Sequence, residues 1–504
     1  MNRLLLFVIL FLILCNLSFS DGFDDGSVFV INDFVFNITG FTRPSALVSK
    51  GDLVTGIEIE GFDELEEYIA DKTQLLFNQR VLDSVSIDYE IGQMRPDGKH
   101  PVDIIVNTND TWNIVAIPRP QYSSSTGFDI ILKARDYNFL GTMTPLRLDI
   151  GYKYDQDGKH SFLFELDSNI PFRAANLDWN IVFWNGFHYR PDTEQPFYFK
   201  NITGLSVDFK ILTTTLTIGF NEHLYYNEEN PNIHKPVHGD FQDGFYMASN
   251  PHLSWRIPTG LQVGEYGDLV FTPGVSAMFT HEFPEWPLDD IWYGPSLSFY
   301  YNFGFKKIDW IGNFLKGFDV SISNLYSYNF YRDDNDMQAW SANLKFNAIG
   351  HIPFGDVFAF SGRISYRHWF FDDFPENAGD VLRGIIDSEV DTEYMISLNL
   401  DLPVRVLQFR PSQWLFESNT RIIDFDLHIV PFIDAAIYKN PALERDFKDT
   451  DFTYKNMLVT AGVEAIIFPE FFRSLFLRIS FGLNFSTLLN TSRYELFIGT
   501  DLHY

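Results

Sequence analysis

In this 504-residue sequence we find none of the residue patterns of common enzyme classes. The interaction that its side chains do suggest is an ion pair. There is no G-x-S-x-G elbow of serine hydrolases, no H-E-x-x-H zinc motif and no phosphate-binding P-loop. The 12 histidines are scattered, and the single cysteine, Cys15, lies in the N-terminal apolar run. We therefore predict no catalytic site, no metal, no cofactor and, in the exported chain, no disulfide.

Arg383 and Asp434 are the charged residues that we expect to interact. Phe432 and Asp434 are two residues apart in an alternating segment, so their side chains share one face of a strand. If that strand crosses a membrane, a carboxylate facing lipid is very costly, and Asp434 is expected on the inner face. An arginine confined there also needs a partner, and the two residues can supply each other. The alternative is two unrelated charges in a water-filled lumen.

Long alternating strands after residue 110 are the elements that must position this pair. One such run places apolar residues at every second position, namely Leu475, Leu477, Ile479, Phe481, Leu483 and Phe485. The runs are about ten residues long, which is the length that a tilted strand needs to cross a bilayer. Aromatic residues make up 17% of the chain, as the two interfacial girdles of a membrane barrel require.

We therefore predict that residues 111–504 form an antiparallel transmembrane β-barrel of about sixteen strands, the fold class being membrane all-β. Five of these strands are expected after Arg383, at residues 394–409, 424–437, 456–468, 474–486 and 493–504. The last strand contains Gly499, Leu502 and Tyr504 and is predicted to pair with the first, because lipid offers no partner to an open edge.

Residues 1–20 are expected to be a secretory signal, since the apolar run Leu4 to Leu14 is too short to span a bilayer as a helix. The alternative is a lipoprotein signal with Cys15 as the lipidated residue. No later run is apolar enough for a membrane-spanning helix. The net charge of −30 argues against nucleic acid as a partner and is typical of acidic, solvated loops.

Residues 21–110 are predicted to form a separate small α+β domain. Strands are expected at 28–39, 85–89 and 102–106, and helices at 44–50 and from Asp63 onward. Glu66, three residues after Asp63, suggests a capping box at the start of the second helix. The turn Arg95-Pro-Asp-Gly-Lys-His100 separates the last two strands.

With these elements in this order, the chain resembles the BamA/TamA superfamily of outer-membrane assembly and translocation proteins, also called bacterial surface antigens. The resemblance covers nearly all of residues 28–504, and residues 21–110 look like one POTRA domain of that superfamily. Its motifs are, in chain order, the turn Gly40-Phe-Thr-Arg43, the strand entry Leu82-Asp-Ser-Val-Ser-Ile87, the early barrel motif Asp136-Tyr-Asn138-Phe-Leu140-Gly141-Thr142, the loop motif Val381-Leu-Arg383-Gly384-Ile385 and the strand motif Phe432-Ile-Asp434-Ala435-Ala436. Three positions depart from the usual pattern: Met143 and Ala436 stand where glycine is usual, and Ile385 stands where an aromatic is usual.

The resemblance implies that the loop folds into the barrel and that Arg383 meets Asp434 on the inner wall. It also implies a bacterial outer-membrane location, with the POTRA-like domain in the periplasm, and a role in inserting or translocating other proteins without catalysis. Outer-membrane lipid, unfolded client proteins and periplasmic accessory proteins are the implied partners. The alternative function is a passive pore or a structural surface antigen. A two-partner secretion translocator usually carries two POTRA domains, which disfavours that branch.

Overall fold

The fold comes from a computed structural model and is nearly all β. It describes residues 27–123, 127–154, 158–192, 196–226, 245–264, 267–282, 295–330, 339–370, 376–377, 381–385, 390–415, 423–439, 457–486, 494–499 and 502–503. The expected signal at residues 1–20, with Cys15, lies outside this range, as does Tyr504. In the part of the chain that the structure describes, no helix has the length and apolar character needed to cross a membrane.

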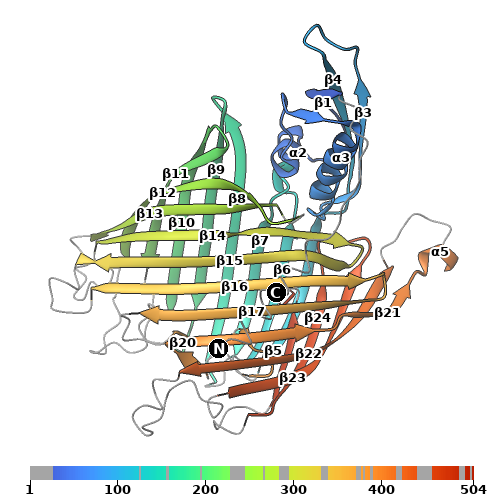
Figure 1. The fold of residues 1–504 in the computed structure, drawn as a ribbon. Helices are drawn as coiled ribbons and strands as arrows, with labels where there is room; N and C mark the ends of the chain where they lie inside the picture. Colours follow the sequence, from blue (N-terminus) through green and yellow to red (C-terminus); the bar gives the residue numbers. More distant parts are fainter. Residues whose placement is uncertain are drawn as a thin grey trace, which may run out of the picture.

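A small α+β domain precedes a large closed sheet (Figure 1). The domain's four strands lie in the order β2-β1-β4-β3, with β1 and β4 parallel and the other pairs antiparallel. Its elements are β1 (Val28–Thr39), α2 (Pro44–Gly51), β2 (Glu58–Glu60), α3 (Phe62–Phe77), β3 (Leu82–Ile91) and β4 (Lys99–Asp110). The short strand β2 is not expected from the sequence, because three residues carry too little periodicity.

Helix α3 buries one apolar stripe against the sheet, including Leu65, Ile69 and Leu76. Its start differs from the prediction. Gly61 is the N-cap, without a side-chain hydrogen bond, so no capping box forms. Glu66 instead accepts a hydrogen bond from the Tyr89 hydroxyl on β3. The carboxylate thus ties the helix to the sheet rather than closing its own first turn.

The large sheet is a closed barrel of nineteen strand segments in which consecutive segments pair as neighbours. These segments are β5 (Ile114–Ser123), β6 (Gly127–Asp136), β7 (Leu146–Tyr154), β8 (His160–Ala174), β9 (Leu177–Tyr189), β10 (Phe197–Ile211), β11 (Thr214–Tyr226), β12 (Phe245–Gln262), β13 (Asp268–Glu282), β14 (Ser296–Ile311), β15 (Phe314–Asn329), β16 (Trp340–Phe354), β17 (Phe358–Phe370), β20 (Tyr394–Asp401), β21 (Val404–Phe409), β22 (Phe425–Lys439), β23 (Met457–Pro469), β24 (Leu477–Asn484) and β25 (Tyr494–Gly499).

The barrel wall has more strands than the about sixteen that we predicted. β20 and β21 both pair with β17 and β22, so nineteen segments with one shared place fill eighteen places in the wall. The sequence undercounts because some hairpins are closed by only two residues. Ala175 and Asn176, both with positive φ, join β8 to β9 as in a type I′ turn. Such turns leave no polar stretch that separates one strand from the next.

The outer face of the wall is apolar. Ile479, Phe481 and Leu483 on β24 are exposed at every second position, and the residues between them are turned inward. Strand β22 alternates most strictly, with every even-numbered residue from Asp426 to Tyr438 buried. An apolar exterior around a polar interior is the pattern of a barrel in lipid. Leu475 departs from its predicted lipid-facing position, since it precedes β24 and is buried.

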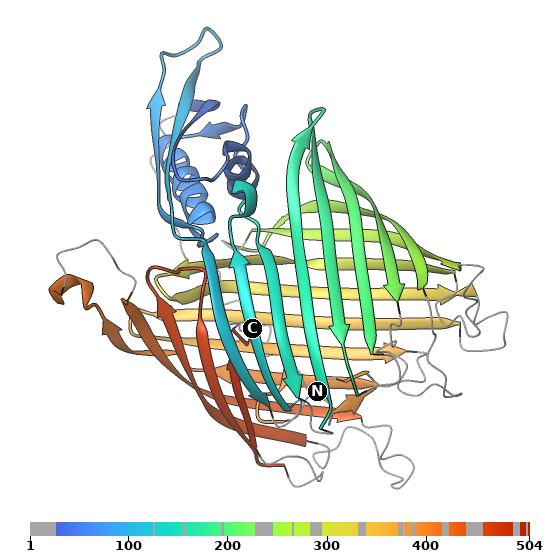
Figure 2. The ribbon, with the colours of Figure 1, turned by 180° about the vertical axis from the view of Figure 1, so that it is seen from behind.

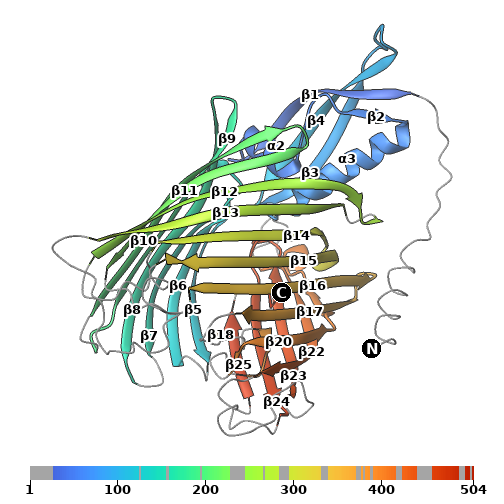
Figure 3. The same cartoon turned by 60° about the vertical axis from the view of Figure 1, so that its left-hand side comes forward.

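The domain lies over one end of the barrel, next to the place where the first and last wall strands meet. Figures 1 and 2 show it above the barrel from opposite sides, and Figure 3 shows its sheet leaning over the barrel end. β5 and β25 are neighbours in the closed sheet, and the Nε of Arg119 on β5 donates to the carbonyl oxygen of Ile498 on β25 at 3.2 Å. We call this junction between β5 and β25 the seam.

Candidate functional site

The structure brings Arg383 and Asp434 into direct contact inside the barrel. The guanidinium donates from Nε and Nη2 to the two Asp434 carboxylate oxygens, at 3.0 and 2.7 Å. The backbone N–H of Arg383 donates to the same carboxylate at 2.9 Å, so loop backbone and side chain are both held. Arg383 is 4% exposed and Asp434 is fully buried. The alternative of two unrelated charges in a water-filled lumen therefore does not hold at these residues.

Two further carboxylates complete the charge cluster around Arg383. Nη2 of Arg383 also donates to Asp401 on β20 at 2.6 Å, and Nη1 lies 3.4 Å from a Glu464 carboxylate oxygen on β23. Arg478 on β24 donates to the same Glu464 oxygen at 3.2 Å. Three acids thus meet two guanidiniums in a buried space, where unpaired charges would be very costly. Nothing in the sequence links Asp401, Glu464 and Arg478, because their meeting depends on strand register.

Four residues of the inner wall form the surface that contacts the loop carrying Arg383, and we call this surface the seat. Phe432, Gly462, Gly482 and Glu495 lie opposite one another across β22, β23, β24 and β25. The guanidinium of Arg383 stacks on the first of these, 3.8 Å from the centre of the Phe432 ring. Such a stacked arginine gains cation–π attraction, which is strongest when the charge is desolvated.

Gly384 occupies the other half of the seat. Its backbone N–H donates to Glu495 at 2.8 Å, and its φ of +86° suits glycine. A Cβ on Gly384 would lie 2.9 Å from the Gly482 backbone, and a Cβ on Gly482 would lie 2.7 Å from the Cα of Gly384. The contact between loop and wall therefore requires two glycines facing each other. The loop is also joined to β25, the last strand, through Glu495.

An apolar cluster inside the barrel supports the same loop. Val381, Leu382 and Ile385 pack with residues of the wall, including Ala436. Ile385 and Ala436 are two of the positions that depart from the superfamily pattern. Both side chains belong to this buried cluster.

The early barrel motif lies at the junction of domain and barrel, where it meets the turn Gly40-Phe-Thr-Arg43. Nδ2 of Asn138 donates to the Thr42 hydroxyl at 2.7 Å and to Asp110 at 3.2 Å. Its Oδ1 accepts from the backbone N–H of Met143 at 2.9 Å. We call these contacts, together with those of Gly141 and Arg43 described next, the clasp.

Backbone contacts and one apolar side chain complete the clasp. The N–H of Arg43 donates to the Gly141 carbonyl at 2.9 Å, and a Cβ on Gly141 would lie 2.1 Å from the Phe41 carbonyl oxygen. Asp136 accepts from the N–H of Asn138 at 3.1 Å, while Leu140 is half exposed with a φ of 54°. Met143, where glycine is usual, also has positive φ, and its side chain joins the domain's buried core. The departure at this position thus adds apolar contact between barrel and domain.

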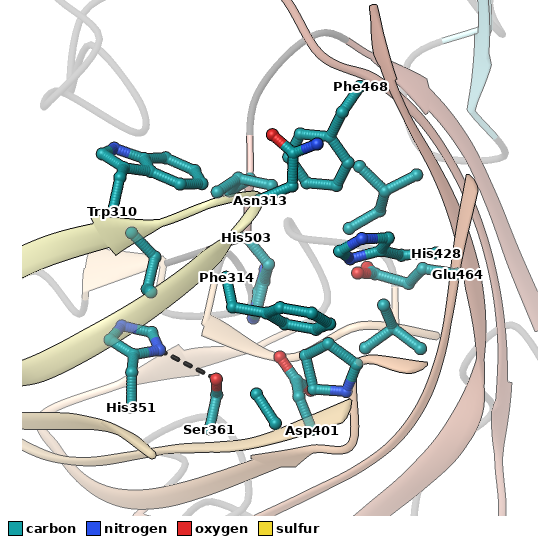
Figure 4. Close-up of a pocket in the computed structure, with 16 residues that line it drawn as sticks. Trp310, Asn313, Phe314, His351, Ser361, Asp401, His428, Glu464, Phe468 and His503 are labelled. Atoms are coloured by element: carbon teal, nitrogen blue, oxygen red, sulfur yellow. Dashed lines mark hydrogen bonds between the residues drawn. The ribbon is translucent and has the colours of Figure 1, made fainter. Parts of the chain in front are cut away.

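The C-terminal residues behave differently from the prediction. β25 ends at Gly499, and Leu502 packs inside the barrel against the buried cluster of Val430, Ile466 and Phe468 rather than facing lipid. His503 lines the same interior region (Figure 4). Tyr504 lies outside the described residues. The alternation of Gly499, Leu502 and Tyr504 predicted a strand to the last residue, but the inward contacts of Leu502 exclude it from the wall.

The hairpin of β14 and β15 reaches the C-terminal wall strands inside the barrel (Figure 4). Its turn residue Asn313 donates to Asp426 on β22 at 2.9 Å, and the Phe314 ring stacks on His428 with centroids 4.6 Å apart. Trp310 stacks on Phe476 with centroids 5.7 Å apart. These contacts join strands that are far apart in the wall order, and residues of the hairpin and of these strands line a cavity of about 60 Å³.

The described residues contain no group of three or more histidine, cysteine, aspartate or glutamate side chains that could hold a metal ion. The geometry of the site is that of a loop held on the inner wall by charged, stacked and glycine contacts.

No family model matches the sequence, and no curated protein matches it. Among solved structures, the chain is similar to BamA from Haemophilus ducreyi lacking POTRA domains 1–3, with 13% identity and a TM-score of 0.41 over 94% of this chain and 84% of that one. It is similar to CdiB from Acinetobacter baumannii, with 11% identity and a TM-score of 0.46 over 94% and 73%. For CdiB from Escherichia coli the values are 8% and 0.41, over 96% and 93%. Similarity at this level does not define a function.

Proposed function

We propose that this protein is an outer-membrane barrel that assists the insertion or translocation of other proteins, with its N-terminal domain acting as a POTRA domain in the periplasm. The observation that carries the proposal is that the domain straddles the seam. On the β5 side the clasp binds the domain to the turn after β6. On the β25 side Thr111, just after the domain, donates to the Phe471 carbonyl at 3.0 Å, and Ser474 donates to the Arg80 carbonyl at 2.8 Å.

Strand β3 supplies the first docking edge for a client. It pairs with β4 on one side only, and beyond Leu82 and Asp83, whose carbonyl oxygens accept hydrogen bonds from Arg473, its other edge has no strand partner among the described residues and can accept an added strand. Main-chain hydrogen bonds to such an edge hold a client segment without requiring one particular sequence, which suits a protein that handles several clients.

The seam supplies the second edge. β25 and β5 are neighbours in the closed sheet. Opening of this junction would expose the edges of β5 and β25 to a client strand. Folding of the client would supply the free energy, so no nucleotide and no catalytic step are needed.

The rival function, a passive pore or a structural surface antigen, requires neither a docked domain nor a filled interior. The hairpin of β14 and β15 and the loop that carries Arg383 both lie in the interior of the barrel, which a passive pore would keep open. The fold alone does not decide between these functions.

Depletion of the protein followed by quantitative outer-membrane proteomics tests the proposal. We expect a subset of other barrel or secreted proteins to fall in abundance while lipid content is unchanged. A photo-reactive residue at the exposed position Glu90 on β3 should cross-link these same proteins during their export, and one at exposed Glu67 on α3 should not. An unchanged proteome, with equal labelling from both positions, would contradict the proposal and favour a pore.

A further inference from the structure

A second cavity, of about 300 Å³, lies where the domain, the hairpin of β14 and β15, and the C-terminal wall strands meet. Four of its lining side chains are arginines: Arg80, Arg405, Arg410 and Arg473. Its acidic lining residues are Asp83, Asp426 and Glu470. An excess of cations is unusual for this chain, which has 67 acidic and only 37 basic residues. The cavity is thus a local positive site on an acidic protein.

Arg80 is the residue whose surroundings most clearly favour binding of an anion. It is 5% exposed, and its guanidinium donates to neutral oxygens, those of the Arg473 carbonyl and of the Asn313 side chain. Its Nη1 has no hydrogen-bond partner among the described residues. A buried guanidinium without an acidic partner is costly, because desolvation is not offset by an opposite charge.

The aromatic rings next to Arg80 offset part of this cost, since its guanidinium lies 4.2 Å from the centre of the Trp310 ring and 5.2 Å from the centre of the Phe476 ring. The charged group that acts on Arg80 is another cation, Arg473, which adds to the cost. Burial and the charge of Arg473 lower the pKa of Arg80 to about 9, which leaves it charged at neutral pH. An anion placed in the cavity would act in the opposite direction and stabilise both arginines.

The other two arginines are held at the rim. Arg410 donates to Asp426 at 2.5 Å and lies 2.8 Å from Glu470, so its charge is matched within the cavity. Arg405 pairs with Asp356 at 2.6 Å, and that carboxylate is 83% exposed. The charge of Arg405 is therefore balanced only by a solvated partner outside the cavity, where screening weakens the pair.

We propose that this cavity binds a phosphate group, carried either by inorganic phosphate or by a phospholipid headgroup. Phosphate presents several acceptor oxygens and matches the planar fork of arginine, so it can engage Arg80, Arg405 and Arg473 together. Its negative charge offsets the excess of cations. The ligand would join the domain, through Arg80, to the wall, through Arg405 and Arg473, and so strengthen domain docking.

The test uses the full chain purified in an uncharged detergent at low ionic strength. Inorganic phosphate is titrated by calorimetry, and a parallel titration uses micelles that contain phosphatidylglycerol, with diacylglycerol micelles as the uncharged comparison. We expect saturable binding that weakens about tenfold in Arg405→Gln, the loss expected for one charge-assisted hydrogen bond. Arg173→Gln, at the exposed end of β8, is the matched control and should bind like the unaltered protein.

Arg80→Gln provides the second variant and should weaken binding at least as much. The Arg80→Gln substitution can also disturb docking of the domain. If that variant does not fold, the result for Arg405→Gln decides the test. If inorganic phosphate binds and displaces phosphatidylglycerol, the site binds free phosphate. If only phosphatidylglycerol binds saturably, the site binds a lipid headgroup. Absence of saturable binding of both probes, or equal affinity in Arg405→Gln and Arg173→Gln, overturns the proposal.

Discussion

At the scale of residues, the charge cluster is asymmetric. Arg383 is the cation shared by Asp401, Asp434 and Glu464, whereas each acid is one of three around it. Removing the arginine leaves several buried carboxylates with less compensation, but removing Asp434 leaves Arg383 with two acids. The two halves of the predicted pair therefore differ in importance.

We expect Arg383→Ala to lower the free energy of unfolding by about 3–5 kcal/mol, the usual cost of breaking a buried ion pair from one side. Asp434→Ala should cost clearly less. The double variant should cost less than the sum of the single variants, because fewer charges are then left unpaired. Urea-unfolding midpoints in lipid vesicles measure all three. Equal and additive single effects would mean that the two side chains do not interact.

Gly482→Ala tests the seat on the inner wall. The new Cβ would lie 2.7 Å from the Cα of Gly384, so the loop must leave the wall or shift. We expect faster protease cleavage between residues 370 and 394 in an otherwise folded barrel. Gly362→Ala on β17 is the control, since its Cβ would meet Leu400 at an ordinary 3.4 Å. Cleavage at the same rate in both variants would contradict the seat.

The sequence is sufficient to predict Arg383 and Asp434 but not their surroundings. Asp434 can be found because a charge in an apolar, alternating segment is costly and needs a partner, and Arg383 can be found because its loop motif resembles that of the superfamily. Asp401, Glu464, Arg478 and Glu495 cannot be found in this way, since which residues face one another depends on the register of four strand pairs. A shift of one residue in any pair would turn a side chain to the outer face.

At the scale of elements, local periodicity predicts the strands and helices well, whereas turns and long-range contacts escape it. The predicted strand at 28–39 and the helix at 44–50 match β1 and α2 almost residue for residue. The strand count is too low because two-residue turns carry little signal. The inward position of the hairpin of β14 and β15 is also missed, since aromatic residues such as Trp310 and Phe314 read equally well as part of a lipid-facing girdle.

Trp310→Ala should loosen this hairpin. The ring stacks on Phe476 and lies next to the guanidinium of Arg80, so its loss removes contacts to both the domain and the wall. We expect a larger and noisier ion conductance of the protein in planar bilayers, because the barrel end widens. Trp340→Ala on β16, whose ring is half exposed, is the matched control and should leave conductance unchanged. Identical conductance in the two variants would indicate that the hairpin does not restrict the barrel.

At the scale of the whole molecule, the domain is held to the barrel through several small contacts. Besides the clasp, Lys307 of β14 lies 3.1 Å from Asp71 of α3, and Asn78 donates to Asp309 at 2.9 Å. β14 lies far from β5 and β25 in the wall order, so these contacts hold the domain at a place away from the seam. This spread of contacts was not predictable from the motifs, which indicate a domain and a barrel but not their relative position.

Asn138→Ala should weaken domain docking. Asn138 is 5% exposed, and its loss leaves the buried Met143 N–H without its acceptor, at about 1–3 kcal/mol for an unsatisfied buried group. Thr42 and Asp110 lose one hydrogen bond each but remain bonded to each other. We expect faster proteolysis at residues 111–113 while the barrel remains heat-modifiable. Asn169→Ala, at an exposed asparagine of β8, serves as the control. A linker that is equally protected in both variants would show that the clasp does not hold the domain.

The contacts of the N-terminal domain on both sides of the seam also affect how the chain completes its own folding. The residues that meet at the seam, Arg119 and Ile498, are 379 positions apart, so closing the cylinder is among the most non-local events in the molecule. The chain loses conformational entropy when it closes this loop, before the contacts at the seam contribute any stabilisation, and this makes the step slow. A domain that forms from local contacts and already touches the turn at 471–474 shortens the remaining search. The N-terminal domain then acts as an internal template for closing the barrel. Without the domain, we expect the pairing of β5 with β25 to limit the rate of barrel formation.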